Sequence, residues 1–100
     1  MMMDRPGEDI EVQDNARDHR FEIHVGEHVA FLTYRRSGTS ISLNHTEVPE
    51  ALRGRGMGDR LARAALDHAR ENGLTVIPIC PFVKAYIKKH PEYEALVAGG

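Results

Sequence analysis

The chain has 100 residues, of which 41% are hydrophobic and 28% are charged, and its formal net charge at pH 7 is -2. This length and composition suit one globular domain with a modest core, and the lack of net positive charge argues against a general binder of nucleic acid or membrane surfaces. The single cysteine, Cys80, excludes a disulfide within the chain and favours a reducing compartment. No apolar run approaches the roughly 18–20 residues of a membrane span and nothing resembles a signal peptide, so we expect a cytoplasmic protein.

The segment 1–17 is polar and acidic and contains one Pro-Gly pair. Only Ile10 and Val12 could anchor it to a hydrophobic core. It is therefore predicted to be a flexible tail, and residues 18–100 are predicted to be the folded domain.

Three strands with short connections are predicted to follow the tail. Residues 21–25 alternate apolar and polar side chains, which is the periodicity of a half-buried strand. Residues 29–34 are apolar or aromatic at nearly every position, so this strand is expected to be covered on both faces. A third strand is predicted for residues 41–48, and turns at Gly26 and Gly38 join the three into an antiparallel meander.

A helix is predicted for residues 57–72, because apolar side chains recur there at helical spacing on one face, namely Leu61, Ala62, Ala65, Leu66 and Ala69. Gly73 is suited to end this helix in a left-handed conformation. Residues 74–79 are then predicted to form a strand, in which Pro78 indicates an edge position, a bulge or the strand end.

A second helix is predicted to begin at Pro81 and to stop at Pro91. Its apolar face would contain Val83, Tyr86 and Ile87, and residues 92–97 are predicted to add one helical turn. The predicted order of elements is therefore β-β-β-α-β-α.

The first helix is preceded by an unusual segment, LRGRGMGDRL, in residues 52–61. A helix N-terminus presents unpaired N–H groups and a partial positive charge, and glycines let an anion approach that backbone closely. Arginines suit phosphate oxygens. No Gly-Lys-Ser/Thr follows, and the spacing is not that of a dinucleotide fingerprint. The segment favours a phosphate or pyrophosphate site, and the alternative is a flexible connector with solvated arginines.

The run Arg53-x-x-Gly56-x-Gly58 is similar to the acyl-CoA signature of the GCN5-related N-acetyltransferases. More broadly, residues 21–96 resemble the small single-domain members called the YjdJ type, through HTEVPEALRGRGMGDRL (residues 45–61) and CPFVKAYIKKHPEY (residues 80–93). This resemblance implies a compact α/β (α+β) domain. In such a domain the antiparallel meander is followed by a splayed strand and a C-terminal helix.

The resemblance also implies acetyl-CoA as the acyl donor, held in a cleft where the central strand leaves its neighbour. The pantetheine arm would lie near Glu47 and Val48, and the pyrophosphate would meet N–H groups of residues 55–59. The expected coenzyme A contacts are therefore Val48, Arg53, Gly54, Arg55, Gly56, Met57, Gly58 and Asp59.

One departure from the family concerns the acceptor. Ordinary members carry two helices between their first two strands, and those helices help to form the acceptor site. Residues 21–48 leave no room for them. The acceptor is therefore expected to occupy an open groove or to be large, such as a peptide or a protein.

Cys80 is the first candidate for the chemistry, because it lies between a strand and the N-terminus of a helix, where a thiolate is favoured. It would act either as a nucleophile through an acetyl-cysteine intermediate or as a polar residue that positions the thioester. The structural alternative is a small buried apolar side chain.

Three further residues are candidates. Tyr86 falls near the position of the tyrosine that protonates the departing thiolate in many family members, although a core tyrosine is the alternative. Glu47 and His45 lie on one face at the end of the third strand, where a general base could reach an amine, or they are ordinary surface residues. No histidine or cysteine pair has metal-ligand spacing, so no metal is expected.

The lysines of the second helix, Lys84, Lys88 and Lys89, are expected to be a solvated face or to contact either the 3′-phosphate or adenine end of coenzyme A or an acidic acceptor. The sequence thus predicts an acetyl-CoA-dependent N-acetyltransferase acting on a small-molecule, peptide or protein amine. Neither nucleic acid nor membrane is an expected partner. A coenzyme A-binding module without catalysis and an interaction domain with a glycine-rich connector are the alternatives.

Overall fold

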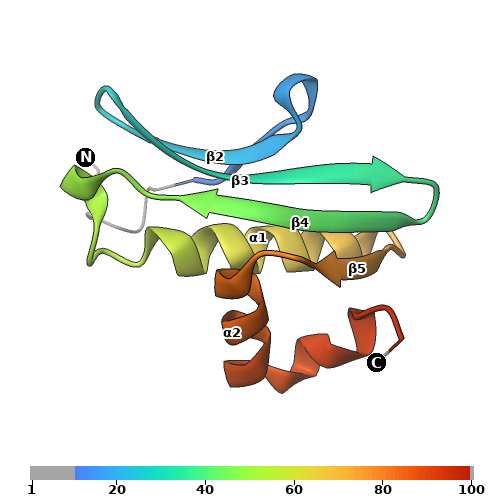
Figure 1. The fold of residues 1–100 in the computed structure, drawn as a ribbon. Coiled ribbons are helices and arrows are strands. Elements are labelled where there is room, and N and C mark those ends of the chain that lie inside the picture. Colours follow the sequence, from blue (N-terminus) through green and yellow to red (C-terminus); the bar gives the residue numbers. More distant parts are fainter. Residues whose placement is uncertain (1–10, 100) are drawn as a thin grey trace, which may run out of the picture.

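The computed structural model describes residues 11–99, which form one five-stranded sheet in the order β1-β2-β3-β4-β5 with both α-helices on one side of it (Figure 1). The elements are β1 (Gln13–Asn15), β2 (Arg20–Val25), β3 (His28–Ser37), β4 (Ser40–Glu47), α1 (Met57–Glu71), β5 (Thr75–Pro78) and α2 (Pro81–Lys89). Short 3-10 helices span Ala16–Asp18, Glu50–Leu52 and Pro91–Leu96. From β2 onward the predicted order β-β-β-α-β-α is confirmed.

The sheet begins earlier than the sequence predicted. Residues 1–10 of the expected tail lie outside the described residues, but β1 pairs antiparallel with β2 in the register Gln13↔Glu22. The hydroxyl of Tyr34 donates to Asp14 at 2.6 Å, and the Asn15 side chain both donates to Glu22 and accepts from the Asp18 N–H. Polar side-chain contacts hold β1, and its three residues show no apolar periodicity.

Strands β2, β3 and β4 form the predicted antiparallel meander. Gly26 takes a φ of +60° in the β2–β3 connection, a conformation that L side chains rarely adopt. The pairing of β3 with β4 shifts by one residue between Thr33 and Tyr34. This irregularity leaves Asn44 as an extra residue on β4, because Thr33 pairs with His45 and Tyr34 pairs with Leu43.

Helix α1 covers one face of the sheet, and the apolar face predicted for it is buried as expected. Ala30, Leu32 and Tyr34 of β3 point into this core, whereas Val29, Phe31 and Thr33 are only half-buried. The expectation that β3 is covered on both faces is therefore met on one face. The connection from β2 to β3 is a tight turn and supplies no helix for the other face.

Helix α1 ends as predicted, with Gly73 at a φ of +65°. Strand β5 then pairs parallel with β4 at the edge of the sheet, and Pro78 is its last residue. Pro81 opens α2, as predicted.

The position of the site is set by where β4 and β5 separate. Their pairing ends at Leu43↔Pro78, and the Leu43 carbonyl accepts from the N–H groups of Ile79 at 3.0 Å and Cys80 at 2.9 Å. The chain then turns into α2, while β4 continues to Glu47 without β5 beside it. The predicted splayed strand is therefore present.

Candidate active site

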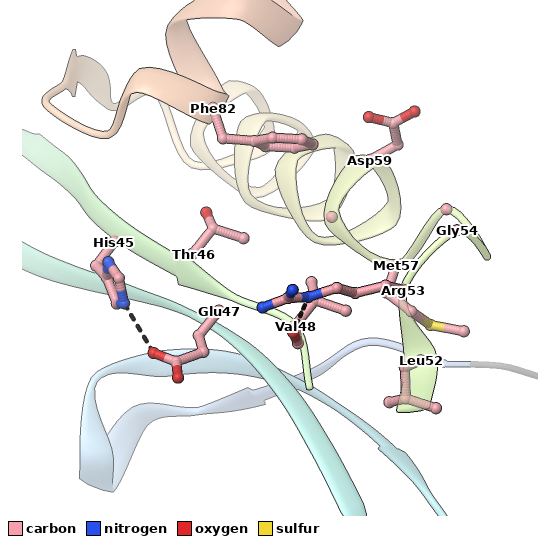
Figure 2. A pocket seen from close by; sticks show the side chains of 12 residues that line it. His45, Thr46, Glu47, Val48, Leu52, Arg53, Gly54, Met57, Asp59 and Phe82 are labelled. Carbon is pink, nitrogen blue, oxygen red and sulfur yellow. Dashed lines mark hydrogen bonds and ion pairs between the residues drawn. The ribbon is translucent and has the colours of Figure 1, made fainter. Parts of the chain in front are cut away.

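A cavity of about 580 Å³ opens where β4 has left β5, between the end of β4 and the first turns of α1 and α2 (Figure 2). Its volume lies in the range of small-molecule sites. It is lined by His45, Thr46, Glu47, Val48, Leu52, Arg53, Gly54, Gly56, Met57, Gly58, Asp59 and Phe82. Residues predicted to contact coenzyme A thus make up most of the lining.

The β4 wall presents different side chains on its two sides. Figure 2 shows Thr46 on the side of Phe82 and α1, with His45 and Glu47 on the opposite side of the strand. The Nε2 atom of His45 lies 3.0 Å from Oε1 of Glu47, and the Glu47 side chain is 59% exposed. A solvated carboxylate therefore stands at the rim of the cleft, on the side away from the helices.

The segment of residues 52–61, which we call the glycine segment, forms the end of the cavity beyond β4. Gly54 and Gly56 take positive φ values of 80° and 78°, so the conformation of this loop depends on glycine. Gly56 is the N-cap of α1 and has no side chain to cap it, and the helix's first hydrogen bond runs from the Arg60 N–H to the Gly56 carbonyl at 3.1 Å. The N–H groups of Met57, Gly58 and Asp59 precede that bond and are suited to an anion.

Arg53 and Arg55, the arginines on either side of Gly54, take different positions. Arg53 lines the cavity, and its Nε donates to the Val48 carbonyl at 3.2 Å, which ties the glycine segment to the end of β4 (Figure 2). Arg55 was also predicted to contact coenzyme A, but it is exposed and does not line the cavity. The predicted backbone contacts are brought together, and the charge beside them comes from Arg53.

Helix α2 contributes Phe82, which the sequence analysis did not single out. Its ring is 40% exposed and lies against the first turn of α1, where a Cβ on Gly58 would come within 2.8 Å of the ring. Gly58 therefore permits the close approach of the two helix N-termini. Phe82 falls within the segment 80–93 that carries the family resemblance, but its contact with Gly58 joins residues 24 positions apart and depends on the packing of two helices.

Cys80 lies behind the cavity wall and not in it. Its side chain is 4% exposed, and Sγ lies 3.4 Å from Oγ1 of Thr46, which does line the cavity. Its N–H is held by the Leu43 carbonyl at the point of separation. Cys80 therefore lies beside the cavity and contacts it through Thr46, a residue that was not among the predicted ones.

Tyr86, the predicted proton donor to the departing thiolate, is a buried residue of α2. It is 7% exposed, stacks on His90 with ring centroids 4.1 Å apart and does not line the cavity. Burial raises the pKa of its hydroxyl above the usual value, and the nearby carboxylate of Asp59 contributes in the same direction. Tyr86 is thus a packed tyrosine within α2 in this structure.

The lysines of α2 also lie away from the cleft. Lys84 and Lys88 border a separate hollow with Pro78, Ile87 and Val97. Over residues 11–99, His, Cys, Asp and Glu side chains form no group of three that could hold a metal ion. None of the helices that the structure describes has the length and apolar character needed to cross a bilayer.

Comparison with known sequences decides the family. A family model described as GCN5-related N-acetyl-transferase matches residues 20–96. The chain belongs to this family. It is 36% identical over 89 residues to Protein NATD1 of Xenopus tropicalis, covering 86% of this chain and 82% of that protein. It is 40% identical over 85 residues to Protein NATD1 of Homo sapiens, covering 82% of this chain and 75% of that protein.

A solved structure agrees with the family. The solution NMR structure of a GCN5-like protein from Staphylococcus aureus superposes with a TM-score of 0.70 at 33% sequence identity, covering 91% of this chain and 90% of that one. The family generally uses acetyl-CoA, and family and fold together support acyl transfer as the general class of reaction. The free edge of β4 and the glycine-capped N-terminus of α1 fit such a donor, since they offer hydrogen bonds to an extended amide chain and to phosphates.

Proposed function

We propose that this protein transfers an acetyl group from acetyl-CoA to a primary amine. One observation carries the proposal: β4 continues to Glu47 after β5 has left it at Leu43, and its free edge leads toward the first N–H groups of α1, which have no partner within the helix. An extended arm with a pyrophosphate at one end matches this sequence of contacts. Neither a nucleotide alone nor a simple anion would use both parts of the cleft.

The residues of the cleft have separate parts in holding the donor. The N–H groups of Met57, Gly58 and Asp59 bind the pyrophosphate, and the Arg53 guanidinium adds a positive charge beside it. Arg53 now donates to the Val48 carbonyl. We infer that Arg53 turns from that carbonyl to the phosphates on binding, which frees the end of β4 for the pantetheine arm.

When bound, acetyl-CoA supplies a thioester whose carbonyl carbon accepts the amine. An alkylamine has a pKa of about 10.4 and arrives protonated, so Glu47 at the rim takes the first proton while His45 holds its carboxylate in place. As the C–N bond forms and the C–S bond breaks, the amine loses its second proton to solvent and the departing sulfur gains one. Tyr86 does not line the cavity, so solvent serves as the proton donor to the sulfur.

We propose that the acetyl group passes directly from acetyl-CoA to the amine, without an acetyl-cysteine intermediate. The role of Cys80 is to position the side chain of Thr46. The contact of 3.4 Å between Sγ and the Thr46 hydroxyl fixes the rotamer of a side chain that faces the cleft. An acetyl-cysteine route requires the buried thiol to reach the cavity past Thr46. The near-complete burial of Cys80 therefore supports a positioning role.

A coenzyme A-binding module without transfer is the second candidate. It is favoured by one observation, which is that no helix in residues 11–99 covers the acceptor side of β4. The two candidates share the donor cleft and differ only in what happens to the acetyl group. For either one we propose the cytoplasm as the location, because a chain with a single cysteine suits a reducing compartment.

Native mass spectrometry of the protein with acetyl-CoA, followed by a denaturing spectrum of the same sample, tests the proposal. We expect a non-covalent complex and no acetyl group surviving on Cys80. Release of free thiol from acetyl-CoA on addition of an alkylamine then separates an acetyltransferase from a binding module. Failure to form any complex would remove the donor cleft and both candidates with it.

A further inference from the structure

The sheet face opposite the helices carries a connected group of polar and aromatic side chains that leads to the cleft. Figure 1 shows α1 and α2 on the other side of the sheet. The cross-strand register sets Glu22 beside Phe31 and Phe31 beside Glu47, and in the adjacent row Arg20 beside Thr33 and Thr33 beside His45. We call the group formed by Arg20, Glu22, Phe31, His45 and Glu47 the open-face patch.

One carboxylate of the open-face patch is already compensated. Glu22 is only 5% exposed, Arg20 donates to it, and His24 Nε2 lies 2.8 Å from its other oxygen. Burial raises the pKa of Glu22, but the hydrogen bonds from His24, Arg20 and Asn15 lower it by a larger amount. The pKa therefore falls from 4.5 to about 2. Glu22 is thus a fixed anion that orients Arg20 and has little capacity left for a ligand.

Arg20 in turn fixes the aromatic ring of the patch. Its guanidinium carbon lies 4.5 Å from the centroid of the Phe31 ring. The ring is half-buried, and its centroid is 6.4 Å from that of His45. The Phe31 ring of β3 therefore presents an apolar surface of fixed orientation next to the cleft rim on β4.

Glu47 contrasts with Glu22. Among the described residues its carboxylate is paired only with His45, and it is well exposed. A cation with an apolar stem would suit both the Glu47 carboxylate and the Phe31 ring, since its charge would meet Glu47 and its methylene groups would pack on Phe31. An unbranched primary alkylammonium has this chemistry, and a branched or anionic amine does not.

We propose that the open-face patch is the acceptor subsite and that it takes the side chain of a lysine in a polypeptide. The inference rests on the proposed function, because Glu47 also lines the donor cleft. A polypeptide source follows from the openness of the face, since no helix in residues 11–99 encloses a small amine there. A peptide backbone supplies the remaining contacts across the exposed strands.

The test compares Phe31→Ala and Phe31→Leu with Val29→Ala, a matched control. Val29 is a half-buried apolar residue two positions away on the same strand, so it shares the face, and it pairs with His24. The probes are a short lysine-containing peptide, n-butylamine and the branched tert-butylamine. Each variant is assayed for KM of the amine, for calorimetric affinity for acetyl-CoA, and for peptide binding when saturated with coenzyme A.

We expect Phe31→Ala to raise the KM for the peptide about tenfold and to weaken peptide binding to the coenzyme A complex by a similar factor. Phe31→Leu should recover most of this loss, Val29→Ala should match the wild type, and acetyl-CoA affinity should stay constant throughout. tert-Butylamine should be the poorest acceptor.

Equal KM values for the Phe31→Ala and Val29→Ala proteins would overturn the subsite, as would equal use of n-butylamine and tert-butylamine. Equal affinity for n-butylamine and the peptide would overturn the polypeptide assignment. A wild-type protein that does not bind acetyl-CoA would instead refute the proposed function. The two failures are thereby distinguished.

Discussion

Gly56→Ala tests the anion site at the start of α1 with a perturbation whose cost can be worked out. Gly56 has a φ of 78°, and a Cβ built on it meets no atom within 4 Å, so the substitution causes no clash. Its cost is backbone strain, which is about 1–2 kcal/mol for an L-residue in the left-handed region. In a domain of this size such a loss lowers the Tm by about 4–8 °C per kcal/mol.

The chain offers a matched control for that strain. Gly26 in the β2–β3 turn has a φ of 60° and also has no atom within 4 Å of a built Cβ, but it does not line the cleft. Gly26→Ala should therefore lower stability by a similar amount and leave coenzyme A affinity unchanged. Gly56→Ala places a methyl group in the cavity itself, and we expect about a tenfold loss of affinity, which is about 1.4 kcal/mol.

Isothermal titration with coenzyme A and urea denaturation of both variants give the two quantities separately. Comparable stability losses with a loss of affinity confined to Gly56→Ala would support the anion site. An unchanged affinity of Gly56→Ala for coenzyme A, alongside the expected loss of stability, would refute the anion site. It would mean that the methyl group added at the N-cap does not contact the ligand.

Three further predictions concern other parts of the molecule. Gly58→Ala should displace the Phe82 ring, which lies 2.8 Å from the built Cβ, and should weaken coenzyme A binding in the same titration. Cys80→Ser should keep its turnover in the thiol-release assay, because a serine can also bond to Thr46; loss of turnover with intact coenzyme A binding would revive the acetyl-cysteine route. Glu22 has its pKa lowered from 4.5 to about 2, so it stabilises the fold above pH 4.5 and this contribution is lost as the pH falls toward 2. Urea unfolding of Glu22→Gln should accordingly show a smaller loss of stability on acidification over that window than the wild type, and parallel curves would contradict it.

Local patterns were enough to predict the elements from β2 to the end of α2. Alternation gave the meander, helical spacing gave α1, and Gly73, Pro78 and Pro81 marked real ends. These signals work because each depends on residues close together in the sequence. Strand β1 lacks such a signal, since it is held by the Tyr34 hydroxyl and by the amide of Asn15.

The same distinction explains the site. The glycine segment and the end of β4 are continuous in sequence, so a motif located nearly all of the donor cleft. The contact of Phe82 with Gly58 and that of Cys80 with Thr46 depend on how α2 packs against α1 and β4. Tyr86 shows the limit in the other direction, because its spacing matched the family role, whereas in the structure it packs against His90 and does not line the cavity.

The donor and acceptor sides therefore depend on different parts of the chain. The donor cleft is built by one continuous stretch of residues with Phe82, whereas the open-face patch exists only through register across three strands. Only His45 and Glu47 belong to both. Substitutions at Arg20 or Phe31 should consequently change acceptor preference without changing coenzyme A affinity, and substitutions at Gly56 should do the reverse. If variants of either group changed both the acceptor preference and the coenzyme A affinity, acceptor and donor would share one site. The assignment of the acceptor to the open-face patch and of the donor to the cleft would then be incorrect.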